Sequence, residues 1–134
     1  MSGDVVYIDS SAFVKLFLPE PDSHALTRYL ASRPRRVSAM LLRTEALRTA
    51  VRAALSPQRM LLVRTLLDSV SYIAADRTLS DEAGILRPPE LRSLHAIHLA
   101  TARALGTNLS ALVTYDERLA DAAGWYGMQV VTPY

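Results

Sequence analysis

The sequence contains no cysteine, and this absence excludes several kinds of chemistry at once. Without thiols the chain has no disulfide framework, no thiolate zinc site and no cysteine nucleophile. It also lacks any run of about 18 consecutive apolar residues, the length that a membrane-spanning helix requires. The acidic residues are scattered, with no tail of like charge. We therefore expect a protein without disulfide bonds and with no membrane among its partners.

Lysine is almost absent: Lys15 is the only one among 15 basic residues, and the others are arginine. The formal net charge is only +2, so the type of basic residue is more informative than the net charge. Arginine presents a rigid fork of donors that suits phosphate and carboxylate groups, whereas lysine acts as a point charge. A genome rich in G and C produces the same preference through its codons, so the bias is compatible with phosphate binding without establishing it.

The chain is 134 residues long, which fits a single domain with a substantial core. No repeat, linker or low-complexity segment divides it. Residues Met1 to Asp4 contain no basic region and lead directly into an apolar run, unlike a secretory signal. We therefore expect one domain over residues 1–134 and a cytoplasmic location.

The stretch from Val5 to Ile8 is unbroken apolar sequence that leads straight into Asp9. Four consecutive apolar residues favour a strand buried on both faces, as in a parallel sheet covered by helices. Asp9 then lies at the carboxyl end of the strand, the edge of an open α/β sheet where ligands bind. An N-cap is an equally good interpretation of Asp9 or Ser10 at this point, because both residue types cap helices well.

Strands are expected to alternate with helices along the rest of the chain, which predicts a mostly parallel five-stranded sheet covered on both faces. The expected helices cover residues 11–18, 21–32, 39–55, 57–68, 78–86, 93–105 and 117–123. The remaining strands are expected at residues 36–38, 70–74, 111–115 and 128–132. Helix caps are expected at Ser38, Ser56 and Thr78, and helix ends at Gly106 and Gly124.

Three acidic residues are expected to meet at one edge of this sheet. Asp9 and Asp116 each follow a strand, one in each half of the chain, and so flank the point where the strand order reverses. Glu45 lies on the helix expected at residues 39–55, where Arg48 follows one turn later. An ordinary ion pair between Glu45 and Arg48 is therefore the alternative explanation of that acid.

Carboxylates gathered in this way repel one another, and the pKa of each is raised unless positive charge is close. A divalent cation supplies that charge. Ligands that are all oxygen, with room for water, suit Mg²⁺ or Mn²⁺. Such an ion can activate a water molecule and stabilise the charge that develops on a phosphate during in-line displacement. The acids thus favour metal-dependent chemistry at a phosphate group.

Several segments together resemble a known family. They are Tyr7 to Leu16, Thr44-Glu45, Leu91 to Ala102 and Val113 to Leu119, which span nearly the whole chain. With these segments the chain resembles a PIN-domain ribonuclease, most closely the toxin of a VapBC-type toxin–antitoxin pair. The resemblance implies a single PIN-like domain with a three-layer α/β/α sandwich. It also implies a Mg²⁺- or Mn²⁺-dependent endoribonuclease that cleaves cellular RNA, inhibits translation and is held inactive by a cognate antitoxin whose tail enters the site; we also expect a homodimer.

By the same resemblance, Asp9, Glu45 and Asp116 take the metal-binding acidic positions. Thr114 takes the hydroxyl position beside them, and Ser10 is expected close to the substrate or around the metal ligands. His95 is also expected in the catalytic set, where the family usually has Asp. Imidazole ligates Mn²⁺ but is a poor ligand for Mg²⁺. The histidine is compatible with natural variation, with a change that disarms a toxin, or with a site that favours another metal.

Other residues near these segments have simpler interpretations. His98, one helical turn after His95, is expected to be a packed and hydrogen-bonded histidine rather than a ligand. Trp125 is expected to fill the core or an interface. Apolar side chains such as those of Leu16, Phe17 and Leu41 flank the expected acidic site, and some of them are expected to remain exposed as a groove for an antitoxin helix.

The sequence leaves two other functions open. The first is an RNA-binding or regulatory domain that keeps the fold with weakened or no catalysis, for which His95 is the argument. The second is a receiver-like phosphorylation domain, because that fold also places acids at strand ends. It requires a lysine after a late strand, whereas the only lysine here is Lys15.

Overall fold

A computed structural model describes residues 3–134 as one five-stranded sheet with helices on both faces. The strands are β1 (Val5–Ile8), β2 (Arg36–Ala39), β3 (Ser71–Ile73), β4 (Leu109–Val113) and β5 (Val130–Val131). Their order is β3-β2-β1-β4-β5, and every neighbouring pair is parallel. The predicted sheet is therefore confirmed, and it is parallel throughout.

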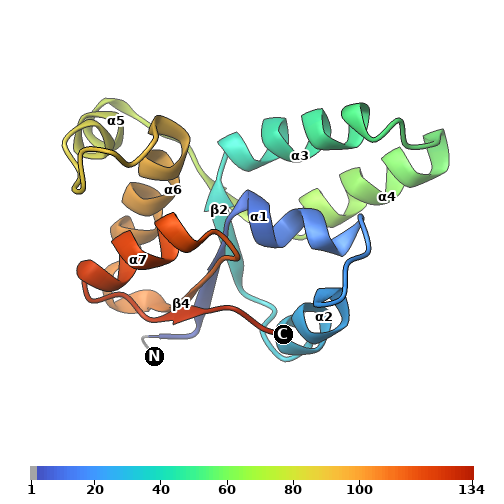
Figure 1. Cartoon of the computed structure of the whole chain (residues 1–134), viewed down its shortest axis with the longest axis horizontal. Coiled ribbons are helices and arrows are strands. Elements are labelled where there is room, and N and C mark those ends of the chain that lie inside the picture. The colour runs from blue at the N-terminus through green and yellow to red at the C-terminus, as the bar shows by residue number, and fades with distance from the viewer. Residues whose placement is uncertain (1–2) are drawn as a thin grey trace.

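The helices form two layers, one on each side of the sheet (Figure 1). On one side lie α1 (Ser10–Phe13), α2 (Ser23–Ala31), α3 (Leu41–Arg52) and α4 (Pro57–Asp68). On the other lie α5 (Arg77–Gly84), α6 (Ser93–Ala104) and α7 (Glu117–Trp125). Two short segments form 3-10 helices, η1 (Val14–Leu16) and η2 (Gly106–Asn108). None of the helices in residues 3–134 is long and apolar enough to span a bilayer.

Strand β1 is the centre of this arrangement because both of its faces are buried. Val6 and Ile8 pack into the apolar cluster under α1 to α4, whereas Tyr7 points to the cluster under α6 and α7. From β1 the sheet extends to β2 and β3 on one side and to β4 and β5 on the other. The strand order therefore reverses between β1 and β4, the position at which open α/β sheets bind ligands.

Two of the predicted helix ends are confirmed. Ser56 accepts a hydrogen bond from the backbone N–H of Arg59 at the start of α4, and Pro57 takes the first helical position. Gly106 follows the end of α6 with a φ of +56°, a left-handed conformation that glycine adopts without strain.

Two of the predicted helix caps are wrong. Ser38 lies inside β2, and its hydroxyl donates to the carbonyl oxygen of Ile8 on β1 instead of capping α3. Thr78 does not cap α5, because Asp76 occupies the N-cap and its carboxylate accepts from a backbone N–H of the first turn. At α5 a neighbouring residue of the capping type takes the position, whereas α3 begins after Met40 without any side-chain cap.

The segment after β4 also differs from the prediction. The strand ends at Val113, earlier than expected, so Asp116 lies beyond it at the start of α7. Gly124 does not end α7, which continues to Trp125, and Gly127 follows with a φ of +77°.

Two aromatic side chains bear on the predictions for the core and for the surface. Phe17 is only 1% exposed and belongs to the core, so it cannot line an open groove for an antitoxin helix. Leu16 and Leu41 are half-buried. Trp125, in contrast, is 71% exposed on the surface of α7, so it does not fill the core, and its placement in an interface stays a prediction. Its edge contacts the ring of Tyr126, with 4.9 Å between the ring centroids.

Candidate functional site

Asp9 follows the central strand directly, and its side chain is almost fully buried. It caps α1, because its Oδ1 accepts a hydrogen bond from the backbone N–H of Ala12 at 3.0 Å. The hydroxyl of Thr114 donates to its Oδ2 at 2.5 Å. Asp9 therefore caps a helix and also lies at the ligand-binding edge of the sheet, so the two interpretations do not exclude each other.

Thr114 reaches Asp9 because of the sheet register. Ile8 on β1 lies opposite Val113 on β4, so the residues that follow them leave the sheet side by side. Thr114 is fully buried, and its hydroxyl oxygen also accepts from the backbone N–H of Asp116 at 3.1 Å. One side chain thus connects the two strand ends and both aspartates.

Ser11 makes the second connection of this kind. Its hydroxyl donates to both oxygens of Asp9, at 2.8 and 2.9 Å, and its oxygen accepts from the backbone N–H of Tyr115 at 2.9 Å. Ser10, the serine expected near the site, forms no side-chain hydrogen bond with the residues that the structure describes. The serine that holds Asp9 is therefore Ser11, which the sequence analysis did not select.

Burial raises the pKa of the Asp9 carboxyl above its ordinary value. Removal of the carboxylate from water is the largest cause, and the hydrogen bond from Thr114, the charge of His98 and the bonds from Ser11 and Ala12 oppose it. No lysine or arginine within residues 3–134 forms an ion pair with Asp9. The carboxyl thus occupies an environment where an added cation would stabilise its charged form.

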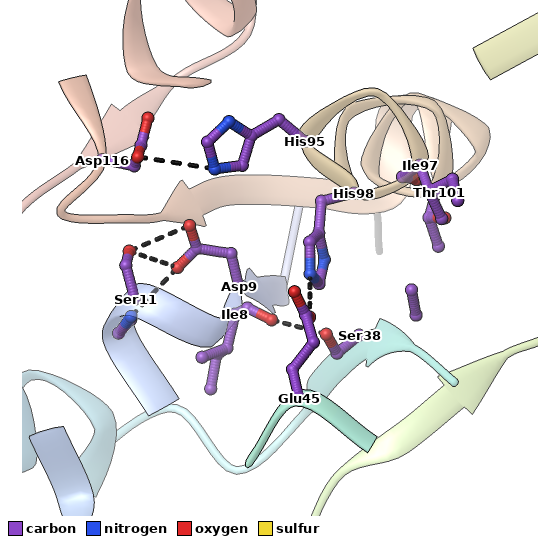
Figure 2. Close-up of polar contacts among 12 residues, drawn as sticks. Ile8, Asp9, Ser11, Ser38, Glu45, His95, Ile97, His98, Thr101 and Asp116 are labelled. Carbon is purple, nitrogen blue, oxygen red and sulfur yellow. Dashed lines mark hydrogen bonds and ion pairs between the residues drawn. The ribbon is translucent and has the colours of Figure 1, made fainter. Parts of the chain in front are cut away.

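Asp116 caps α7 with one oxygen and faces His95 with the other. Its Oδ1 accepts from the backbone N–H of Leu119 at 2.9 Å, and its Oδ2 lies 3.4 Å from His95 Nε2. Figure 2 shows the His95 ring reaching from α6 toward Asp116, above Asp9. His95, at the position where we expected an acid, therefore lies next to one of the expected metal ligands.

Glu45 belongs to a separate hydrogen-bonded pair. Its Oε1 lies 2.7 Å from His98 Nε2, and His98 Nδ1 lies 2.6 Å from the hydroxyl of Tyr7 (Figure 2 draws the first of these contacts). His98 is fully buried, which confirms that it is a packed, hydrogen-bonded histidine. In the part of the chain that the structure describes, Glu45 forms no ion pair with Arg48.

The only lysine lies in another ion-pair network. Lys15 Nζ is 2.8 Å from Asp22 Oδ1 and 3.3 Å from Glu20 Oε1, and it lies 4.5 Å from the centre of the Tyr115 ring. It therefore neutralises acids next to α2 rather than Asp9. This placement gives no support to a receiver-like phosphorylation site.

Figure 2 places the side chains of Asp9, Glu45 and Asp116 around one edge of the sheet, but each carboxylate has its own partner. Across residues 3–134, no three side chains of the metal-ligating types are close enough together to hold one ion. The donors themselves are carboxylate and hydroxyl oxygens, which fit Mg²⁺ or Mn²⁺ chemically. Joint ligation by the three acids stays a prediction.

The residues that form hydrogen bonds with these acids could be predicted from the sequence to different degrees. Ser11 follows Asp9 at a helix start, so a capping pattern was visible, although it did not distinguish Ser11 from Ser10. His98 was visible as a polar residue on an apolar helix. Nothing in the run from Val5 to Ile8 indicated that Tyr7 directs its hydroxyl toward His98.

Comparison with known proteins gives consistent results. The sequence matches the PIN domain over residues 6–124. It is 46% identical over 128 residues to Ribonuclease VapC46 of Mycobacterium tuberculosis, covering 96% of this chain and 97% of the relative. It is 39% identical over 133 residues to Ribonuclease VapC35 of the same species, with the same coverage of both chains.

Solved structures share the fold at lower sequence identity. A toxin–antitoxin complex from Klebsiella pneumoniae contains a chain that superposes with a TM-score of 0.73 at 24% identity, covering 96% of this chain and 98% of that one. Mycobacterium tuberculosis VapC20, described as a toxin that cleaves the sarcin–ricin loop, superposes with a TM-score of 0.75 at 16% identity, covering 96% and 99%.

Proposed function

Because the chain belongs to the PIN-domain family, with ribonucleases of the VapC type as relatives, we propose that it is a metal-dependent endoribonuclease and a toxin. It cleaves cellular RNA in the cytoplasm and so inhibits translation, and a cognate antitoxin neutralises it. The supporting observation is the buried Asp9, which lies where the strand order reverses and receives hydrogen bonds from Thr114 and Ser11.

The ligands proposed for Mg²⁺ or Mn²⁺ are Asp9, Asp116 and Glu45. When bound, the ion supplies the charge that activates a water molecule and stabilises the phosphate during displacement. Thr114 and Ser11 orient the Asp9 carboxylate by donating to it. Glu45 is available through its second oxygen, since His98 engages only Oε1.

The assay is cleavage of total RNA by the purified chain with Mg²⁺ or Mn²⁺, with EDTA as the control. We expect cleavage that EDTA abolishes and that Asp9→Asn reduces to background. Asp121→Asn is the matched control, because Asp121 is an exposed acid on α7 away from these contacts. Cleavage that persists in EDTA, or equally in Asp9→Asn, would refute the metal-dependent mechanism.

A PIN-like RNA-binding or regulatory domain with weakened catalysis is the second candidate. The observation that favours it is His95, which lies against Asp116 Oδ2, where an anionic side chain would strengthen a cation site. The same assay separates the candidates, because a regulatory domain binds RNA without a metal-dependent loss of full-length RNA.

The proposed partners are RNA, the antitoxin and a second copy of the chain. An antitoxin tail that carries an arginine would place a rigid cationic fork beside Asp9 and Asp116, where it would compete with the metal. Light scattering after size-exclusion chromatography tests the proposed homodimer, for which a monomeric mass would be the contrary result.

A further inference from the structure

A chain of hydrogen bonds, buried at its two central side chains, runs from β2 through β1 and α6 to α3. It begins at the backbone N–H of Ala39, which donates to the hydroxyl oxygen of Tyr7 at 3.1 Å. It continues from Tyr7 to His98 Nδ1 and from His98 Nε2 to Glu45 Oε1. Tyr7 and His98 are both 0% exposed, so neither side chain exchanges these partners for water.

The direction of the bonds follows from the donors and acceptors available. A carboxylate only accepts, so the proton between His98 and Glu45 belongs to Nε2. In the neutral imidazole this leaves Nδ1 as an acceptor, and the Tyr7 hydroxyl donates to it. The Tyr7 hydroxyl has one proton, which it donates to Nδ1, while its oxygen accepts from the backbone N–H of Ala39. Each member therefore fixes the orientation of the next.

Glu45 is the member that needs such an anchor. Its side chain is 19% exposed and extends from α3, which packs through Leu42, Ala46 and Ala50, whereas Asp9 is held by its own helix cap. A long carboxylate side chain loses rotamer freedom when it is ordered. The bond from His98 holds Oε1, so Oε2 is the oxygen left for a metal ion.

We propose that His98, oriented by Tyr7, is a positioning residue that directs the free oxygen of Glu45 toward the metal. The inference rests on the proposed function. A neighbour that orients a metal-ligating carboxylate affects affinity even though it never contacts the ion.

A matched pair of amide substitutions tests this proposal. In His98→Gln the amide nitrogen reaches the position of Nε2 and can still donate to Glu45. In His98→Asn the shorter amide stays near the position of Nδ1, close to Tyr7, and does not reach Glu45. Both variants replace the imidazole with a neutral amide and differ in the bond to Glu45. Asn is also one methylene shorter than Gln and leaves the larger cavity at this buried position, so thermal unfolding is measured to separate the packing loss from the loss of the bond.

The measurement is Mn²⁺ affinity of the metal-free protein, followed by the electron paramagnetic resonance signal of free Mn²⁺, with thermal unfolding alongside. We expect His98→Asn to weaken Mn²⁺ binding by roughly 10- to 100-fold and His98→Gln to remain within about threefold of the unmodified protein. Glu45→Gln added to His98→Asn should cause little further loss. Tyr7→Phe, which keeps the ring, should weaken Mn²⁺ binding less than His98→Asn.

The outcomes separate this proposal from the proposed nuclease. If Asn and Gln at position 98 weaken Mn²⁺ binding equally, or if neither weakens it, His98 does not position Glu45, even though RNA cleavage remains. If Glu45→Gln alone leaves Mn²⁺ affinity unchanged, Glu45 is not a ligand and the inference is wrong. If the unmodified chain neither binds Mn²⁺ nor cleaves RNA, both proposals fail.

Discussion

At the scale of single residues, His95 is the side chain whose replacement is expected to raise activity. Its Nε2 lies 3.4 Å from Asp116 Oδ2, in the position where the family resemblance leads us to expect an acid. An aspartate there would add negative charge beside the proposed ion and remove a nitrogen donor that suits Mg²⁺ poorly.

We therefore expect His95→Asp to raise RNA cleavage with Mg²⁺ by roughly 10- to 100-fold. The unmodified chain should work relatively better with Mn²⁺. Asp9→Asn in the His95→Asp background should abolish the gain, which separates the metal site from contaminating nuclease. Equal Mg²⁺-dependent cleavage by the unmodified chain and His95→Asp would mean that this position lies outside the metal site.

Asp9 gives a prediction about stability, because burial raises its pKa in the folded chain. Near pH 4, the ordinary pKa range of aspartate, the unfolded chain begins to release this proton while the folded chain still holds it. The free energy of unfolding of the metal-free protein should therefore fall as pH rises from this range toward the folded-state pKa.

In Asp9→Asn this part of the pH dependence should vanish, because the amide does not titrate. Urea unfolding in EDTA at several pH values measures the difference, and Asp121→Asn controls for loss of an exposed carboxylate. Added Mn²⁺ should stabilise the unmodified chain and not Asp9→Asn. Parallel pH profiles for the two proteins would contradict the burial argument.

At the scale of elements, the turn between β4 and α7 depends on α1. Ser11 accepts from the backbone of Tyr115 in this turn while it donates to Asp9, so one hydroxyl joins the two segments. We expect Ser11→Ala to cost about 1 to 3 kcal/mol, because it leaves a backbone N–H without its acceptor.

Ser10→Ala is the matched control, since Ser10 precedes Ser11 in the same helix and forms no side-chain hydrogen bond within residues 3–134. Its cost should stay within about 0.5 kcal/mol. Urea denaturation of both variants measures the contrast, and equal losses would show that helix propensity rather than the cross-link is responsible.

The elements of this fold were predictable where a pattern is local, and less so where a tertiary contact decides. The apolar run at Val5 to Ile8 predicted the central strand, and Ser56 before Pro57 predicted the start of α4. Ser38 also looks like a cap, but the carbonyl of Ile8 takes its hydroxyl, which only the neighbouring strand makes available.

The same distinction applies to the candidate site. The position of Asp9 follows from the end of a local apolar run, which made it predictable. Thr114 reaches Asp9 through the register of β1 and β4, and the predicted strand had placed Thr114 inside it. The pairing of Glu45 with His98 joins residues from α3 and α6. No local spacing relates those two helices, so the sequence offered a neighbouring arginine as the alternative partner of Glu45 and did not indicate His98.

At the scale of the whole molecule, the proposed toxin should be recognisable by its partner. Co-expression with the product of an adjacent small open reading frame should give a stable complex and suppress growth arrest. The complex should bind Mn²⁺ more weakly than the free chain, and replacement of an arginine in the partner's tail by alanine should restore Mn²⁺ binding. Absence of any co-purifying partner would count against the toxin assignment and leave the nuclease proposal intact.

The exposed ring of Trp125 has a consequence for spectroscopy. It is the only tryptophan in the chain, and most of its surface already faces solvent in the folded state. Its emission maximum should therefore shift little on denaturation, so circular dichroism is the better reporter of unfolding. For the same reason, a blue shift on mixing with another macromolecule would arise from the covering of α7, which makes this indole a built-in fluorescent label for that surface.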